Sequence, residues 1–320
     1  MSRDGEPSSE AEVPLEREGQ YRRLEELGRG GQSVVVRAFD EFVAREVALK
    51  HLVVPREQGV PGEGTEDSPR AFGPGTTSTK DDDRQAAARK RFLREARLTA
   101  RLDHPGIVAV LELAQRPDGT IFCAQKLVRG ETLKKRLERC TSLRDRLQLL
   151  PHLIDACQAV AYAHAHQVIH RDLKPSNIML GSFGETVVVD WGLARASGEP
   201  EPVEPGGEWS NEPGVTRTGL TMGTPGYMSP EQARGERAKV DERSDVFSLG
   251  VVLYELLTGR IPFDGANAEH RLERLLTGEF HPVRVLCSEA PPELAAIAER
   301  ALSGDPDARY HDAGALAKEL

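Results

Sequence analysis

The chain changes character once along its length, near Gly130, and this change limits the folds that it can adopt. Before that point, short runs rich in β-branched residues alternate with turn residues, at 21–27, 34–39, 46–54, 107–113 and 120–126. Such runs predict a small antiparallel sheet of five strands. After it, apolar residues recur at three- and four-residue spacing, which indicates helices. A sheet-forming part followed by a helix-forming part predicts an α+β chain of two lobes, 19–129 and 130–320.

Several apolar patterns predict where the helices lie. A stripe from Phe92 to Leu102 predicts one helix in the first lobe, ending before Pro105. A stripe from Leu143 to His164 predicts a long amphipathic helix, although Pro151 favours a start of the helix proper near itself. Residues 246–257 are apolar on nearly all sides and predict a central buried helix, and further helical patterns cover 269–278, 291–303 and 312–320.

Glycine and proline are more frequent than in an ordinary globular chain, with 30 and 21 copies in 320 residues. Many of them lie in two segments, 55–80 and 198–214. Residues 55–83 carry almost nothing to bury and predict a disordered insertion, and residues 1–18 predict a disordered acidic tail. The second segment lies between Asp190 and Glu231 and predicts a mobile stretch there.

Charge and hydropathy exclude several classes of protein. A net charge of -9 disfavours a protein whose main role is to bind nucleic acid. The chain has no run of about 18 apolar residues that could form a membrane helix. Its N-terminus is acidic and lacks the apolar stretch of a signal peptide, so we expect a cytoplasmic location and reduced cysteines.

A glycine-rich run, Leu27 to Val36, is followed by Lys50 in VALK. Glycines between two strands let backbone N–H groups approach phosphate oxygens, and a lysine on a strand supplies a positive charge. A strand follows the glycines, and the pattern GxxxxGK[ST] is absent from the sequence, so dinucleotide and P-loop sites are excluded. A nucleotide site and a plain glycine-rich hairpin both remain open at this point.

Three further motifs decide between these readings: HRDLKPSN at 170–177, VVVDWG at 187–192 and GTPGYMSPE at 223–231. With the glycine run and the lysine, in this order, residues 21–320 resemble the protein kinase family. AYAHAHQVIHRDLKPSNIML and PGYMSPEQA resemble its bacterial (Hanks-type) serine/threonine branch. The resemblance implies a bilobal kinase-like fold, with a small antiparallel sheet and one helix, αC, in the N-lobe and a larger helical C-lobe.

The resemblance also implies the roles of the reacting groups. Asp172 is expected to accept the proton of the substrate hydroxyl, and Lys174 to neutralise the γ-phosphate. Asn177 and Asp190 are expected to hold Mg²⁺, with Mn²⁺ as the alternative. ATP is the expected co-substrate, and its implied contacts are Leu27, Gly28, Gly30, Gly31, Ser33, Val35, Ala48, Lys50, Glu95, Lys126, Val128 and Met179. Among these, Lys50 is expected to bind the α- and β-phosphates and to be held by Glu95.

Other matched residues support the site. Glu231 and Arg309 match a buried ion pair below the protein-substrate platform, and Thr224 is expected to contact Asp172 and Lys174. Asp245 matches the aspartate that supports the backbone of the 170–177 loop. The remaining structural residues implied are His170, Arg171, Trp191 and Gly192.

The sequence departs from the family pattern at three positions. Ser33 replaces the third loop glycine, Trp191 replaces the usual phenylalanine of the 190–192 turn, and Lys126 stands where a carboxylate is usual. None of these removes a reacting atom. A larger aromatic ring at Trp191 can change the balance between active and inactive turns.

Regulation is expected in the segment 190–231. Thr216 and Thr218 lie before Thr224 as activating phosphothreonines do, which suggests autophosphorylation, with Arg171 binding the new charge. Ordinary loop threonines are the alternative. Phosphorylation in trans would require transient self-association.

The sequence therefore predicts a serine/threonine protein kinase that uses ATP and protein substrates, with no nucleic-acid partner. A pseudokinase scaffold is the alternative, disfavoured because Lys50, Glu95, Asp172, Asn177 and Asp190 are all present. A small-molecule phosphotransferase is disfavoured by the GTPGYMSPE platform. The basic residues between 84 and 101 are read as a solvated helix face.

Overall fold

The computed structural model describes residues 13–30, 33–52, 79–196 and 226–320. They fall into two compact units, one reaching Arg94 and including Val110–Leu127, the other made of Glu95–Ala109 and Val128–Leu320. The segment 95–109 belongs to the second unit, and the chain enters that unit again after Leu127. The lobe bounds 19–129 and 130–320 stay predictions.

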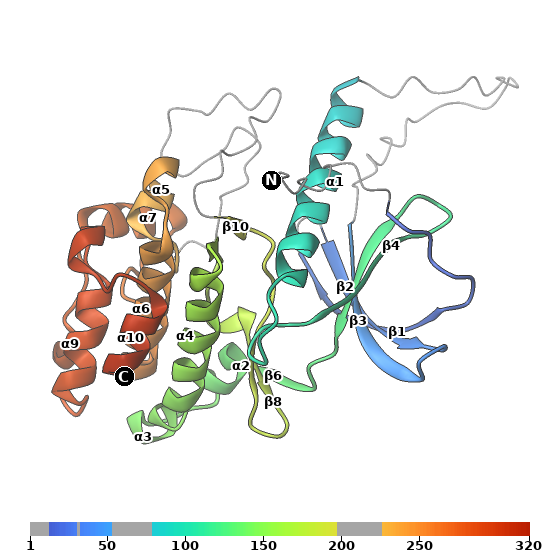
Figure 1. Ribbon diagram of the computed structural model, residues 1–320. Helices are drawn as coiled ribbons and strands as arrows, with labels where there is room; N and C mark the ends of the chain where they lie inside the picture. The colour runs from blue at the N-terminus through green and yellow to red at the C-terminus, as the bar shows by residue number, and fades with distance from the viewer. Residues whose placement is uncertain (1–12, 31–32, 53–78, 197–225) are drawn as a thin grey trace, which may run out of the picture. The chain divides into compact units, whose positions relative to one another are not determined.

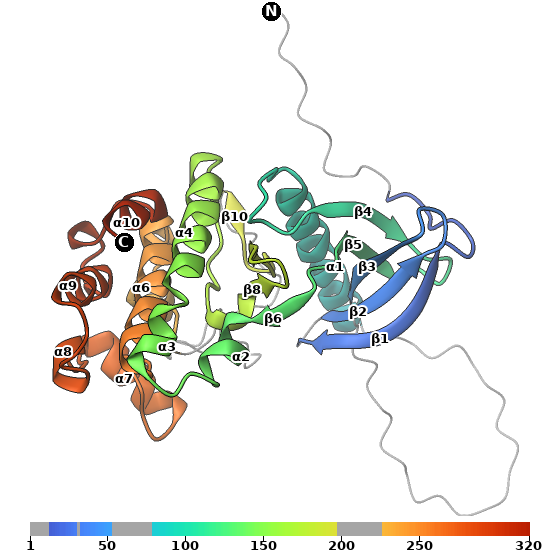
Figure 2. The ribbon, with the colours of Figure 1, turned by 90° about the horizontal axis from the view of Figure 1, so that it is seen from below.

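The first unit contains a five-stranded sheet (Figure 2). Its strands are β1 (Tyr21–Arg29), β2 (Ser33–Asp40), β3 (Arg45–Leu52), β4 (Val110–Gln115) and β5 (Ile121–Lys126). They pair antiparallel in the order β1-β2-β3-β5-β4, which confirms the predicted antiparallel sheet of five strands. Alternate residues of β2, Val34, Val36 and Ala38, are buried on one face, as the period of two in a strand requires.

Two boundaries differ from the prediction. Helix α1 (Thr79–Ala100) begins inside the expected insertion 55–83. The sequence has three aspartates at 81–83, and acidic residues favour the first turn of a helix because of its dipole. Strand β4 begins at Val110, not at 107, because Val108 N–H donates to Val188 O at 3.1 Å and Ile107 bridges Val188 in the second unit.

The second unit is built around helix α6 (Glu242–Thr258), which is buried along most of its length and confirms the predicted central helix. Helices α3 (Leu143–Leu147), α4 (Leu150–Ala165), α9 (Pro292–Ala301) and α10 (Ala313–Glu319) pack against α6 (Figure 1). Gly259 ends α6 with a φ of 74°, a left-handed conformation that glycine adopts without strain. The unit also contains α5 (Pro230–Ala233), α7 (Ala268–Thr277) and α8 (Val283–Leu286).

The expected long helix from Leu143 is in fact two helices. Ser142 and Asp145 form a capping box that starts α3, and α3 ends at Leu147. Helix α4 starts at Leu150 with Pro151 in its first turn, where the missing N–H of proline costs no hydrogen bond. The prediction that the helix proper starts near Pro151 is therefore confirmed.

Short strands and turns connect the long helices and carry the remaining motifs. They are β6 (Gly130–Thr132), α2 (Leu133–Leu137), β7 (Val168–Ile169), a 3-10 helix at Pro175–Asn177, β8 (Ile178–Gly181), β9 (Thr186–Val188), β10 (Arg195–Ala196), and 3-10 helices at Arg237–Lys239 and Pro306–Ala308. Strands β6, β8 and β9 form one small sheet, and β7 pairs with β10. Within the described ranges, no helix combines the length and the apolar character that crossing a membrane would require.

Candidate active site

The 170–177 loop connects β7 to β8, and a buried aspartate of helix α6 holds its start. Asp245 Oδ1 accepts a hydrogen bond from the backbone N–H of Arg171 at 2.8 Å, and Oδ2 accepts one from the N–H of His170 at 2.8 Å. Arg171 has a φ of 69°, a conformation that side-chain-bearing residues seldom adopt and that the surrounding contacts must enforce. The structure thus shows the contact expected for Asp245.

His164 completes this arrangement, and the sequence reasoning did not find it. Its Nε2 lies 2.9 Å from Asp245 Oδ2, while its Nδ1 accepts a hydrogen bond from the backbone N–H of Ala313 at 3.4 Å. Nε2 is therefore the donor to Asp245. Burial alone would raise the pKa of Asp245, but the hydrogen bond from His164, together with that from the backbone N–H of His170, outweighs burial and holds this pKa below its usual value. The signal in the sequence was weak, because His164 stands within an apolar stripe.

The ring of His170 links the loop to the segment before Asp190. Its Nδ1 accepts the N–H of Asp172 at 3.3 Å, so Nε2 carries the proton and donates to Val189 O at 3.3 Å. Burial lowers the pKa of His170, so the ring stays neutral at pH 7. A neutral ring can make both contacts at once, which fixes the distance between the two segments.

Three predicted residues of the loop lie together. Lys174 Nζ donates to Asp172 Oδ2 at 2.6 Å. Asn177 Nδ2 donates to the backbone oxygen of Asp172 at 2.9 Å and lies 3.3 Å from its Oδ2. The carboxylate of Asp172 is about 12% exposed, so it can still reach a ligand. A carboxylate, an ammonium group and an amide thus converge on one point.

A backbone hydrogen bond joins this cluster to the segment that leads into the 190–192 turn: Val189 N–H donates to Asn177 O at 2.9 Å. Asp190 has a φ of 61°. A Cβ atom placed on Gly192 would lie 3.3 Å from Asp190 Oδ1 and 3.4 Å from Glu95 Oε2, so Gly192 allows two carboxylates to approach the turn. Glu95 therefore lies beside the turn, inside the second unit.

Trp191 packs where the family usually has phenylalanine. Its side chain is buried, its ring centroid lies 4.6 Å from that of His170, and its Nε1 donates to Val188 O at 3.4 Å. The indole satisfies its polar atom inside the core, which a buried tryptophan requires. The larger ring is accommodated in this turn.

The oxygen donors here fit a magnesium ion. Asn177 uses its amide nitrogen toward Asp172, which leaves its oxygen as the end available to a ligand, and Asp190 adds a carboxylate. Mg²⁺ prefers such oxygens and is commonly held by few protein groups together with substrate phosphates. In the described part of the chain, no cluster of three or more His, Cys, Asp and Glu is placed so that it could hold a metal.

In the first unit, three of the expected ATP contacts, Gly28, Val35 and Lys50, lie in one row across the sheet. Gly28 pairs with Val35, Val35 with Lys50, and Lys50 with Cys123. Val47 and Leu49 face the apolar core of this unit, so Lys50 and Ala48 point to the opposite face. Within the glycine-rich run, Gly30 N–H donates to Ser33 O at 2.8 Å.

The expected ATP contacts belong partly to the first unit and partly to the second. Leu27, Val35, Ala48, Lys50 and Lys126 belong to the first unit, whereas Glu95, Val128 and Met179 belong to the second. Met179 pairs with Thr132 and Val187 in the small sheet. The Lys50–Glu95 pair and the adenine contacts therefore stay predictions. Gly31, Thr216, Thr218 and Thr224 lie outside the described residues.

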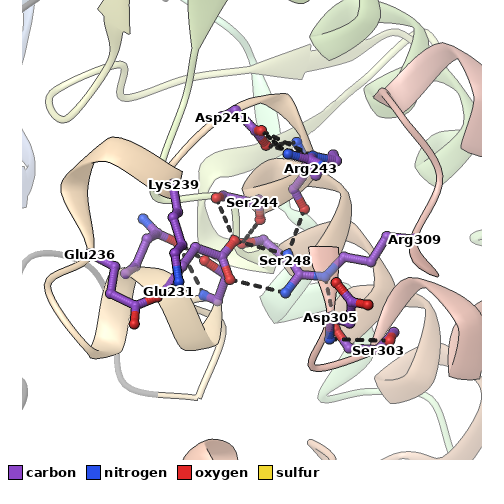
Figure 3. A network of polar contacts seen from close by, with 12 residues as sticks. Glu231, Glu236, Lys239, Asp241, Arg243, Ser244, Ser248, Ser303, Asp305 and Arg309 are labelled. Carbon is purple, nitrogen blue, oxygen red and sulfur yellow. Dashed lines mark hydrogen bonds and ion pairs between the residues drawn. The ribbon is translucent and has the colours of Figure 1, made fainter. Parts of the chain in front are cut away.

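The expected pair below the substrate platform is present (Figure 3). Arg309 donates to both carboxylate oxygens of Glu231, at 2.9 and 3.0 Å, and both side chains are almost fully buried. Ser244 donates to Glu231 Oε1 at 2.6 Å, and Arg309 also donates to Ser303 O at 2.8 Å and Arg243 O at 3.0 Å. Burial would raise the pKa of Glu231, but these hydrogen bonds and the charge of Arg309 hold it below its usual value.

Gln232 connects this platform to the 170–177 loop and was also missed. Its Nε2 donates to the backbone oxygen of Arg171 at 2.8 Å, while its Oε1 accepts from Ser229 N–H at 3.0 Å. Ser229 and Gln232 form the capping box that starts α5. The spacing S-x-x-Q was readable in the sequence, but it indicated only a helix start.

Comparison with known proteins agrees with this geometry. A family model described as a protein kinase domain matches residues 76–319, and the chain belongs to the protein kinase family. The chain is 32% identical to the serine/threonine-protein kinase PknD of Protochlamydia amoebophila, over 94% of this chain and 29% of that protein. It is 35% identical to the serine/threonine-protein kinase PknB of Mycolicibacterium smegmatis, over 96% of this chain and 43% of the relative. A probable serine/threonine-protein kinase of Streptomyces coelicolor is 33% identical, over 97% of this chain and 40% of that protein. The chain thus spans less than half the length of these relatives.

Proposed function

We propose that this chain transfers the γ-phosphoryl group of ATP to serine or threonine hydroxyls of proteins. The observation that carries the proposal is the convergence of Asp172, Lys174 and Asn177 on a loop whose backbone is held by Asp245. The names of the relatives support serine and threonine as acceptors, because each is called a serine/threonine-protein kinase.

Phosphoryl transfer asks a protein mainly to position groups and to offset charge. Asp172 Oδ2 accepts the proton of the attacking hydroxyl and orients that oxygen. Lys174, now 2.6 Å from Asp172, is close enough to place its ammonium group against the transferring phosphoryl oxygens. Because the Asp245 contacts set the loop backbone in advance, these groups need little rearrangement during the reaction.

Asn177 and Asp190 are proposed to hold the metal through their side-chain oxygens. Bound there, Mg²⁺ would offset part of the negative charge of the phosphates, and Mn²⁺ is the alternative ion. In the first unit, Lys50 is proposed to bind the α- and β-phosphates beside the glycine run. Adenine is proposed to contact Val35, Ala48 and Met179.

Regulation and location remain part of the proposal. Phosphorylation at Thr216 and Thr218 would add charge that Arg171 can bind, and it would proceed between two copies during transient self-association. Thr224 would contact Asp172 and Lys174 beside the substrate, and the buried Glu231–Arg309 pair would brace the platform that presents the protein substrate. A cytoplasmic site of action agrees with a need for ATP.

The test compares wild type with Asp172→Asn and Asp190→Ala in MgATP, following phosphate on the protein itself and on a generic basic protein. Asp103→Asn, an exposed aspartate in the connection after α1, is the matched control. Transfer by wild type and by the control, with a loss of about a hundredfold or more in both other variants, supports the proposal. Binding of MgATP by the wild type without any transfer would favour the pseudokinase reading.

A further inference from the structure

The segment 13–20 lies along β4, an edge strand of the five-stranded sheet. Its backbone extends the sheet, since Glu16 N–H donates to Gln115 O at 2.8 Å and Gln115 N–H donates to Pro14 O at 2.8 Å. Leu15 thereby forms a parallel bridge with Gln115. An open edge strand is a template for pairing with another chain. The segment covers that edge with part of the same chain.

Side chains fasten the segment at two points. Glu16 Oε2 lies 3.2 Å from Arg116 Nε, and the two side chains are only 13% and 22% exposed. The guanidinium of Arg116 also lies over the ring of Phe122, 5.5 Å from its centroid. Further along, Gln20 Nε2 donates to Glu112 at 2.9 Å. Loss of Glu16 would leave a largely buried arginine without this partner, which is costly.

Gln115 connects the segment to helix α1. Its backbone pairs with residues 14–16, and its side-chain Oε1 accepts a hydrogen bond from Arg89 Nη2 at 3.1 Å. Arg89 lies on α1, and Glu95 follows on the same helix about 9 Å further along the axis. Glu95 is the residue whose carboxylate lies beside the 190–192 turn. One residue of β4 thus contacts both the N-terminal segment and the helix that carries Glu95.

We propose that residues 13–20 form an intramolecular strap whose docking on β4 holds α1 in the position that activity requires. The inference rests on the proposed kinase function, because it assigns a regulatory role at that same site. When the strap leaves, β4 becomes an open edge, Arg116 loses Glu16, and the backbone of Gln115 loses its two strap hydrogen bonds. The support that Gln115 gives to Arg89 then becomes looser. The strap is therefore an activating element.

The experiment uses three variants of the full chain. Glu16→Lys reverses the charge at the largely buried pair, and Glu16→Lys with Arg116→Glu exchanges the two charges. Glu18→Lys is the matched control, since Glu18 carries the same charge on an exposed position two residues on. Two quantities are measured: hydrogen exchange of peptides covering 110–116 and 85–100, and kcat/KM for phosphate transfer to a generic basic protein.

We expect Glu16→Lys to speed exchange in both peptides by about tenfold and to lower kcat/KM by about three- to tenfold, because local opening controls exchange. The charge exchange should restore both quantities to within about twofold of wild type, as a direct pair requires. The control should match wild type. These outcomes together support the strap.

Three results overturn the inference. Faster exchange at 110–116 with unchanged exchange at 85–100 shows that the strap docks without holding α1. Higher kcat/KM in Glu16→Lys shows that the strap inhibits. Failure of the charge exchange to restore either quantity shows that the pair does not fasten the strap. If the wild type transfers no phosphate, the proposed function fails, and exchange at 85–100 alone then decides whether the strap holds α1.

Discussion

Removing one partner of the buried Glu231–Arg309 pair should destabilise the second unit strongly. Arg309→Met keeps an apolar stem of similar length but leaves Glu231 charged and almost fully buried. It also removes the hydrogen bonds to Ser303 O and Arg243 O. Breaking a buried pair in this way costs about 3–5 kcal/mol. For a unit of this size the melting temperature should fall by roughly 6–20 °C.

The double variant sharpens the test. Glu231→Gln with Arg309→Met leaves no uncompensated charge, so it should cost less than the sum of the two single changes. The exposed pair of Arg22 and Glu41 provides the control, because Arg22→Ala should change stability by about 1 kcal/mol or less. Urea unfolding at pH 7, followed by circular dichroism, gives each free energy of unfolding.

Acidity adds an independent check on the same pair. The pKa of Glu231 is lowered in the folded protein from an ordinary value of 4.5, so its contribution is fully present above that pH. The contribution is lost as the pH falls through the folded pKa. The stability difference between wild type and the double variant should therefore narrow below pH 4.5. Two results would refute the reasoning. One is that Arg309→Met lowers the free energy of unfolding by less than about 1 kcal/mol. The other is that the effects of the two single changes add up to the effect of the double variant.

Two substitutions and one labelling measurement probe other parts of the second unit. Asp245→Asn should lower phosphate transfer by about a hundredfold and leave the fold intact, because an amide cannot accept all the hydrogen bonds that the carboxylate now accepts. Steady-state kinetics measures the loss of transfer, and circular dichroism checks the fold. Arg146→Ala should cost about 1–2 kcal/mol in urea unfolding, because Arg146 donates to Leu256 O and Leu257 O at the end of α6. Burial raises the pKa of the Cys157 thiol, so native protein at pH 8 should resist alkylation there while half-buried Cys140 reacts, as peptide mass spectrometry can measure.

Predictions from the sequence were most accurate where the residues involved are neighbours within one short motif. The residues of the 170–177 loop meet as expected because their spacing within one short loop leaves few alternatives. Pro151 likewise marked the start of α4 correctly, since its missing N–H is tolerated only in a first turn. Local chemistry was enough in both cases.

Contacts between distant segments were the harder part. His164 lies 81 residues before Asp245, and nothing in its neighbours shows that its ring reaches across to α6. The segment 95–109 joins the second unit because Ile107 and Val108 meet Val188, a pairing that a strand-like run cannot reveal. The start of α1 was missed because residues 79–83 follow a stretch rich in glycine and proline with almost nothing to bury, and were assigned to that stretch.

The dependence of the 170–177 loop on Asp245 has a consequence for variation in this protein. Because the loop takes its backbone geometry from a residue on a buried helix, a substitution in the packing around α6 can change the chemistry without touching any group that meets substrate. A screen for inactivating mutations should therefore yield two kinds of allele. One kind alters the reacting groups, and the other displaces α6 by a fraction of an ångström and leaves every reacting group in place in the sequence.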